Sequence, residues 1–197
     1  MASDNSGRKS APFVISYDAP VTLSFAIISL IVVLISMGTG GRFVENFFCS
    51  YFTRFSDPLM YLRMFTHVIG HSGWSHYMSN MLLFLILGPI LENKYGSRNL
   101  LEMIAITAFV TSLIYMVFFR GAGLCGASGI VFMFIILAST VNFKKQVIPL
   151  SFLLVFVLYI GGEIVTAVTV RDNIAQLAHV IGGICGAAFG AFYAKGK

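Results

Sequence analysis

The sequence predicts an all-α polytopic membrane protein, a single bundle of six transmembrane helices with a long membrane-embedded first loop. Of its 197 residues, 57% are hydrophobic and 11% are charged, whereas soluble domains carry about 25% charged residues. A soluble chain of this size could not bury so much apolar surface. The hydrophobic residues also gather into six runs, each near the roughly 20 residues that cross a bilayer core as a helix. These runs are 21–37, 74–91, 100–118, 124–143, 147–168 and 174–194.

Residues that start or interrupt helices mark the ends of these runs. Pro20 precedes the first run and suits the N-terminus of a helix. Polar breaks separate the later runs at 92–98, 120–121, 144–146 and 171–173. Because no internal repeat or interdomain linker is visible, we expect one membrane domain over 20–197, after a short N-terminal cytoplasmic arm over 1–19. We interpret the cysteines as small packing residues rather than a disulfide framework, since their number is odd; they are Cys49, Cys125 and Cys185.

The connection between the first two runs, about 38–73, is unusually long and aromatic. Its apolar residues recur at spacings of three and four, as Phe43, Phe47 and Tyr51 illustrate. A plain solvated loop would carry fewer aromatic side chains. We therefore expect this connection to form short amphipathic helices that lie in the membrane interface.

The basic residues predict the orientation of the chain. With the N-terminus inside, eight Lys and Arg residues lie on the inner side and five on the outer side, three of these in the long first loop. Because positive charge in short loops favours the inner side, we expect an integral protein of a cell (inner) membrane, N-in and C-in. The basic residues stand in short clusters between apolar runs, so binding of nucleic acid is not expected.

Four polar side chains fall at one depth under this topology. The second, fourth and sixth runs all pass from outside to inside, and each carries one or two of these residues near its outer end. They are His76 and Asn80, Ser128, and His179. At 1.5 Å rise per residue, all four lie within roughly the outer third of the membrane. Polar groups in membrane segments are costly and mark functional sites.

Ser128 and His179 are the predicted catalytic residues, as nucleophile and general base. Taken alone, a serine like Ser128 is more often a small residue that lets helices approach, and a buried histidine like His179 is usually a hydrogen-bonded packing residue. Gly126 and Gly129 flank Ser128 and let N–H groups at a helix start face a developing oxyanion. The nearest carboxylate on the helix of His179 is Asp172, about two turns outside, which predicts a dyad.

Two further pairs support this interpretation. His76 and Asn80 are four residues apart, share one helix face, and can donate hydrogen bonds either between helices or to an oxyanion. Phe132, one turn after Ser128, is predicted to pack on the imidazole of His179. Gly182 begins a stripe of small residues, continued by Gly186 and Gly190, that can draw the sixth helix against a neighbour.

These motifs resemble those of the rhomboid family of intramembrane serine proteases, with its bacterial-type six-span core. The matching segments are Gly126-Ala127-Ser128-Gly129, Ala178-His179-Val180-Ile181-Gly182 and His76-Tyr77-Met78-Ser79-Asn80, supported by 63–71 and 92–96. They lie in the family's order over about residues 55–190. One departure is Leu62-Arg63, where many members have Trp-Arg, and it concerns the loop rather than the chemistry.

The resemblance implies a serine endopeptidase with a Ser128–His179 dyad, whose oxyanion is held by His76, Asn80 and the backbone N–H of Ser128. It implies that transmembrane protein substrates are cleaved near their outer ends, within the lipid bilayer, in a water-filled cavity open to the outer side. No cofactor and no metal are expected. We also expect the outer end of the fifth run, with Gly161-Gly162 and the link 171–173, to move as a gate.

Other function classes fit less well. A proteolytically inactive rhomboid-like protein that binds membrane clients shares the fold but normally lacks the dyad. A transporter would favour paired repeats or interrupted helices in matched positions, and the sequence shows neither. Zinc at His67, His71 and His76 lacks an H-E-x-x-H pattern, and the G-x-G-x-x-G match at 121–126 follows no strand. The sequence leaves open the substrate, the oligomeric state, and the roles of His67, His71 and Glu163.

Overall fold

The computed structural model describes residues 17–119, 123–140 and 173–195, together with residues 150, 154, 157, 158 and 161. The regular elements within these ranges are all helices, so the predicted all-helical fold class is confirmed. They are α1 (Pro20–Gly38), α2 (Arg42–Phe47), α3 (Pro58–Thr66), α4 (Trp74–Tyr95), α5 (Ser97–Phe118), α6 (Ser128–Thr140) and α8 (Asn173–Lys195).

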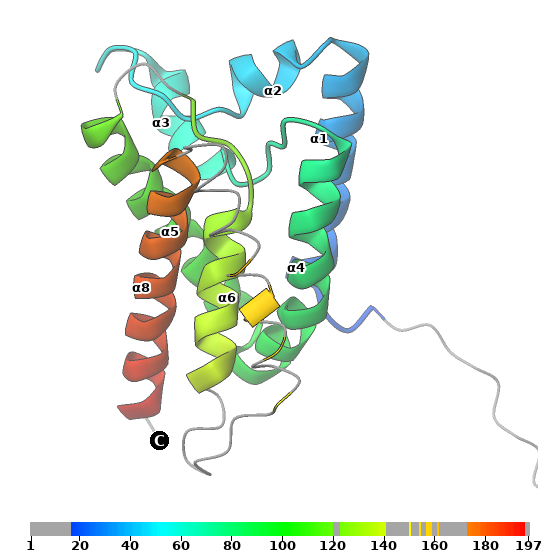
Figure 1. Ribbon diagram of the computed structural model, residues 1–197, viewed down its shortest axis with the longest axis vertical. Coiled ribbons are helices and arrows are strands. Elements are labelled where there is room, and N and C mark those ends of the chain that lie inside the picture. The colour runs from blue at the N-terminus through cyan, green and yellow to red at the C-terminus, as the bar shows by residue number, and fades with distance from the viewer. Residues whose placement is uncertain are drawn as a thin grey trace, which may run out of the picture.

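The long helices alternate in direction (Figure 1). α1 and α5 run toward the end of the molecule formed by α2 and α3, and α4, α6 and α8 run away from that end. The N-terminal ends of α4, α6 and α8 therefore point the same way, as the sequence predicts. This arrangement is what brings the polar residues of three separate helices to one level.

Four described helices are long and apolar enough to cross a membrane: Pro20–Gly38, Trp74–Tyr95, Ser97–Phe118 and Gln176–Ala194. α6 is a shorter apolar helix. Most of the fifth predicted run, 147–168, lies outside the described residues. Gly162 and Glu163 of that run, and residues 171–172 of the predicted gate, are also outside them. The protein is thus a polytopic helical membrane protein, with the exact number of spans still a prediction.

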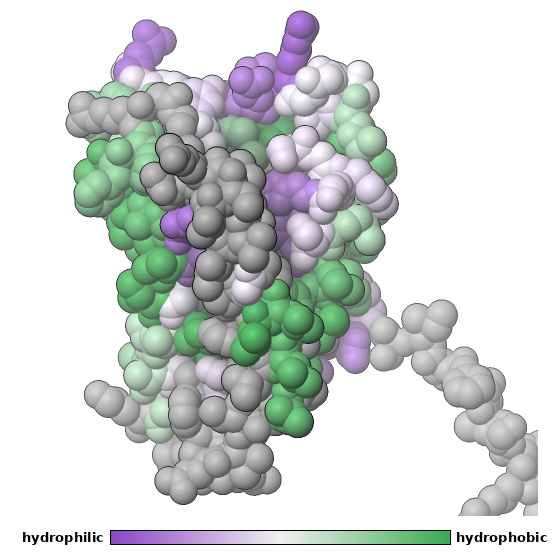
Figure 2. All heavy atoms as spheres, viewed as in Figure 1, coloured by the Kyte–Doolittle hydropathy of each residue, from purple (hydrophilic) through white to green (hydrophobic). Residues whose placement is uncertain are grey.

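The surface fits this environment. Figure 2 shows hydrophobic residues along the sides of the long helices and hydrophilic residues gathered at the end that carries α2 and α3. Along α1, large apolar side chains stay exposed within the molecule, among them Ile27, Ile31 and Leu34. Such a row of exposed apolar side chains fits contact with lipid and would be costly in water.

Two helix ends differ from the ends of the apolar runs. The fourth apolar run begins at about residue 124, whereas α6 begins at Ser128, at the helix start expected between Gly126 and Gly129. The reason is that Leu124 pairs with Ser50 as an isolated antiparallel bridge, and Gly126 adopts a φ of 122°, which leaves the helical region. The polar break expected at 92–98 is confined to Gly96, since α4 continues to Tyr95.

Glu92 belongs to the core instead of a loop. It is 3% exposed, and its carboxylate accepts hydrogen bonds from the N–H of Val21 and Thr22, each at 2.9 Å. The hydroxyls of Thr22 and Ser97 donate to the same carboxylate at 2.8 Å. The first N–H groups of a helix have no partner within it, so Glu92 of α4 caps the start of α1 and joins the two helices.

Aromatic stacking holds the middle of the bundle. Phe84 of α4 stacks on Phe25 of α1 with ring centroids 4.5 Å apart, and on Phe134 of α6 at 4.9 Å. Offset stacking of this kind adds about 0.5–1.5 kcal/mol per pair beyond burial. These contacts hold α1, α4 and α6 together below the level of the polar residues.

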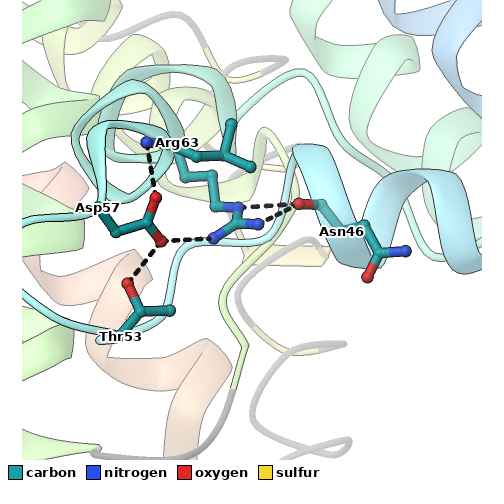
Figure 3. Close-up of polar contacts among 5 residues, drawn as sticks. Asn46, Thr53, Asp57 and Arg63 are labelled. Carbon is teal, nitrogen blue, oxygen red and sulfur yellow. Dashed lines mark hydrogen bonds and ion pairs between the residues drawn. The ribbon is translucent and has the colours of Figure 1, made fainter.

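The predicted short helices of the first loop are confirmed as α2 and α3. Arg63 of α3 is 5% exposed, and its side chain reaches across to Asn46 of α2 (Figure 3). Its guanidinium donates two hydrogen bonds to the carbonyl of Asn46, lies 3.9 Å from the carboxylate of Asp57, and covers the ring of Tyr51 at 4.6 Å. The Thr53 hydroxyl donates to Asp57 at 2.8 Å and lowers the pKa of that carboxyl. One buried arginine thus fixes the shape of this loop.

Candidate active site

Ser128 is the first residue of α6 and is half-buried. The first hydrogen bond of the helix runs from the N–H of Val131 to the carbonyl of Ala127 at 2.9 Å. The N–H groups of Ser128 and Gly129 therefore lie in the first turn, where no intrahelical acceptor exists. This position combines a hydroxyl with the positive end of a helix dipole.

The backbones of α6 and α8 touch beside Ser128. A Cβ placed on Gly182 would lie 2.0 Å from the carbonyl oxygen of Gly129, and one on Gly186 would lie 2.5 Å from that of Met133. A Cβ on Gly129 would in turn lie 3.2 Å from the carbonyl oxygen of Ala178. Only glycine permits the first two distances, so the predicted close packing of Gly182 and Gly186 is present. It brings the Ser128 end of α6 against the turn of α8 that carries residue 179.

His179 is 6% exposed and lies in this contact. Its imidazole stacks on the ring of Phe132, with centroids 4.2 Å apart and planes inclined by 10°. The packing of Phe132 on the imidazole, predicted from its spacing to Ser128, is therefore present. A ring held flat against another ring keeps one plane, which limits the directions in which its nitrogens can point.

His76 reaches the same place from α4. A Cβ on Gly126 would lie 2.7 Å from Nε2 of His76 and 2.8 Å from its Cε1, so the imidazole covers this glycine. The backbone N–H of Ser72 donates to Nδ1 at 3.4 Å, and the Ser72 hydroxyl lies 3.0 Å from the same nitrogen. Because a backbone N–H can only donate, Nδ1 carries no proton and neutral His76 has its proton on Nε2. A hydrogen-bond donor thus faces the loop before Ser128.

Asn80 lies one turn further along α4 and is 2% exposed. Its Nδ2 donates to the carbonyl of His76 at 2.9 Å, and its Oδ1 has no hydrogen-bond partner among the described residues. A buried amide with unused capacity is costly. One N–H of the amide stays available for a further acceptor at this level.

The loop before Ser128 is tied to the first loop through His67. The N–H of Gly126 donates to the carbonyl of His67 at 2.9 Å, and Nε2 of His67 donates to the carbonyl of Ala108 on α5 at 3.1 Å. Burial lowers the pKa of His67 to about 4, so its ring is neutral at pH 7. This role was left open by the sequence, whose only signal is a polar residue within an apolar stretch.

A second tie comes from Ser50. Its backbone exchanges two hydrogen bonds with Leu124, at 2.8 and 2.9 Å, and its hydroxyl bonds to that of Ser112 on α5. Ser50 is fully buried. Sequence reasoning missed this residue, because nothing local indicates that residue 50 pairs with residue 124.

His71 forms a hydrogen bond within the first loop, apart from the residues around Ser128. Its Nδ1 donates to the carbonyl of Ile69 at 3.0 Å, and its ring lies edge-on to His76 with centroids 5.1 Å apart. Burial, with a smaller effect of His76, lowers the pKa of His71 to about 4. In the ranges that the structure describes, no group of three or more His, Cys, Asp or Glu side chains could hold a metal ion.

Three parallel helices of a polytopic membrane protein therefore bring His76 and the turn of α8 that carries His179 to the N-terminal end of α6, where Ser128 lies, with Asn80 one turn further along α4. The Rhomboid domain family matches residues 58–196, from the first residue of α3 to just beyond α8. The chain belongs to the rhomboid family, which is a family of intramembrane proteases. A comparison with curated proteins finds no match.

Proposed function

We propose that the protein is an intramembrane serine endopeptidase in which Ser128 and His179 form the catalytic dyad. The observation that carries this proposal is the backbone contact between Gly129 and Gly182. Gly129 follows Ser128, and Gly182 lies one turn after His179 on α8. This contact supports the dyad, because it joins the residue after Ser128 to the turn that follows His179 at the N-terminal end of α6.

In this mechanism Ser128 Oγ attacks the scissile carbonyl while His179 accepts the hydroxyl proton. The imidazolium then donates that proton to the leaving amine, and water releases the acyl group from Ser128 by the same steps in reverse order. The stack on Phe132 replaces the orienting role that a carboxylate has in a triad. Because the ring lies flat on Phe132, this stack fixes the plane of the imidazole.

The oxyanion is held where negative charge develops, at the start of α6. The N–H of Ser128 points there with the helix dipole, and His76 supplies the Nε2–H that faces Gly126. Asn80 supplies its remaining N–H from one turn along α4. Donors that are already fixed in place cost no reorganisation when the transition state forms.

The substrates are transmembrane proteins. A helical substrate hides its carbonyls in its own hydrogen bonds, so it must unwind locally before Ser128 can reach one. We place the N-terminal ends of α4, α6 and α8 on the outer side of a cell membrane, N-in and C-in, since the short inner loops hold more basic residues. Cleavage then falls near the outer end of the substrate helix.

The test is cleavage of a model transmembrane substrate by the purified protein in liposomes. Ser128→Ala and His179→Ala should each abolish cleavage, and the double variant should be no worse than either, because the pair acts as a unit. Ser139→Ala is the matched control, since Ser139 lies at the opposite end of the same helix, where its hydroxyl donates to the carbonyl of Ile136 at 2.6 Å. Full activity of Ser128→Ala would disprove the assignment. A client that binds but is never cut would favour the inactive client-binding alternative.

The orientation has its own test. In a cysteine-free background, single cysteines at Arg54 in the first loop and at Arg98 at the start of α5 should react differently with an impermeant thiol reagent applied to intact cells. We expect labelling at position 54 alone. Labelling at position 98 alone would place the dyad on the inner side.

A further inference from the structure

Cys49 of the first loop and Cys125 of the loop before Ser128 stand opposite each other. Ser50 and Leu124 form an antiparallel bridge in which each N–H donates to the other's carbonyl. In antiparallel pairing, the residue before one member faces the residue after the other, so Cys49 faces Cys125 in a non-hydrogen-bonded position. Cα atoms in such a pair are about 4.5 Å apart, within the roughly 4.4–6.8 Å that a disulfide spans.

The side chains agree with the backbone. Cys125 packs against the small apolar cluster that contains Cys49, Val32 and Val44. Both residues are free cysteines. The third cysteine, Cys185, lies on α8 and packs on the main core instead. The arrangement of two facing thiols could not be read from residues that are so far apart in the sequence.

We propose that Cys49 and Cys125 form a disulfide, a modification that covalently ties the loop before Ser128 to the first loop. The oxidant is a disulfide of a donor on the side of the membrane where Ser128 lies, either a small molecule or a protein. Thiols on the outer side of a cell membrane are the ones that meet such donors. The presence of such donors on the outer side and the effect of the bond on cleavage rest on the proposed function, whereas formation of the bond in the experiment below does not.

The exchange begins at Cys125. Its thiol is half-buried, whereas Cys49 is 8% exposed, so a donor reaches Cys125 first. Interaction between the two thiols lowers the pKa of Cys125 and raises that of Cys49, which makes Cys125 the better thiolate. The Cys125 thiolate attacks one donor sulfur, breaks the donor disulfide, forms a mixed disulfide and releases one donor thiol.

The second step closes the bond. The thiolate of Cys49 attacks the sulfur of Cys125 in the mixed disulfide and releases the second donor thiol. The two cysteines together lose two electrons and two protons, and the donor disulfide is reduced to two thiols. No backbone rearrangement is needed, because the bridge between Ser50 and Leu124 already holds the two loops in register.

The bond should preserve the site and make it more durable. The N–H of Gly126 is already held by the carbonyl of His67, so closure beside it leaves Ser128 in place. The disulfide closes a loop that contains α3, α4 and α5. Cross-linking so long a loop constrains the unfolded chain strongly, so the midpoint of thermal inactivation should rise by on the order of 10 °C.

The experiment uses the full chain in liposomes, treated with oxidised glutathione or with a reductant, then alkylated and digested. After oxidation we expect a peptide pair linked through Cys49 and Cys125, with Cys185 still alkylated. Cys185→Ser is the matched control and should behave like the wild type. In Cys49→Ser, Cys125 should be recovered as the mixed disulfide with glutathione. If Cys49 and Cys125 both stay alkylated after oxidation, or if the bond involves Cys185, the proposal is wrong.

A second measurement tests the consequence. The oxidised wild type should cleave the model substrate as fast as the thiol form does, and it should keep its activity to a higher temperature. Cys125→Ser should show no such shift in temperature. Loss of cleavage on oxidation would refute the claim that the bond preserves the site. Because the linked peptides are detected by mass, a protein without protease activity would still show whether the bond forms.

Discussion

Replacing Gly182 by alanine tests the closest helix contact in the proposed site. The added Cβ would lie 2.0 Å from the carbonyl oxygen of Gly129 and 2.8 Å from its carbonyl carbon. Both atoms belong to the backbone of α6, so no side-chain rotation can relieve the clash. Contacts closer than 3.0 Å are essentially never seen for real Cβ atoms. α6 and α8 must therefore separate by about 1.4 Å, the difference between this 2.0 Å and the 3.4 Å at which ordinary van der Waals contact begins.

This displacement acts directly on the dyad, because Ser128 adjoins Gly129 and His179 lies one turn before Gly182. A misplacement of about 1 Å between reacting groups can cost a hundredfold in rate, and overpacking of this kind costs about 1–3 kcal/mol of stability. We expect Gly182→Ala to fold with reduced stability and to cleave about a hundredfold more slowly. The loss should lie in kcat more than in KM.

The assay is steady-state cleavage of the model substrate in liposomes, with the thermal unfolding of each variant measured in parallel. The control is Gly183→Ala on the same helix, whose Cβ, among the described residues, would meet only the side chain of Ile136 at an ordinary 3.7 Å. It should keep the activity of the wild type. If Gly182→Ala cleaves as fast as Gly183→Ala, the contact between α6 and α8 does not position the dyad.

Two further predictions concern the histidines and the amide around Ser128. His76→Ala and Asn80→Ala should each lower kcat by up to about a hundredfold while Ser79→Ala, on the exposed side of α4, changes it little; a loss of stability with unchanged kcat would make these two residues helix contacts only. His67 has a pKa near 6.5 when unfolded and about 4 in the folded protein, so its contribution to stability is present above pH 6.5 and is lost as the pH falls toward 4. The midpoint of thermal inactivation should therefore fall as the pH is lowered from 6.5 to 4, and it should fall less steeply in His67→Gln. Equal dependence on pH in the two proteins would contradict this role of His67.

Local patterns predicted most of the secondary structure and part of the site. A run of about 20 apolar residues in a membrane must satisfy its own backbone hydrogen bonds, and only a helix can do so within one segment. The runs at 21–37, 74–91, 100–118 and 174–194 therefore became α1, α4, α5 and α8 with small shifts at their ends. The stacking of Phe132 on His179 followed in the same way, from the spacing of one helical turn between Ser128 and Phe132.

Charge and polarity within those runs also placed the polar residues at one level. The alternation of helices is forced by short connections, so residues near the starts of α4, α6 and α8 had to share one end of the bundle. The sequence alone thus determined the all-helical class, the family resemblance, and the identity of Ser128, His179, His76 and Asn80 as the residues to test. Their catalytic roles stay predictions until the variants are assayed.

Only the tertiary structure decided the contacts between distant segments. The start of α6 depends on the pairing of Leu124 with Ser50, the capping of α1 depends on Glu92, and the facing thiols depend on the position of residue 49 beside residue 125. The physical reason is that a local pattern fixes which way a residue points along its own helix or loop. Which residue of another segment it contacts depends on how whole helices pack. At Gly129 and Gly182 the helices pack closely because neither glycine has a side chain.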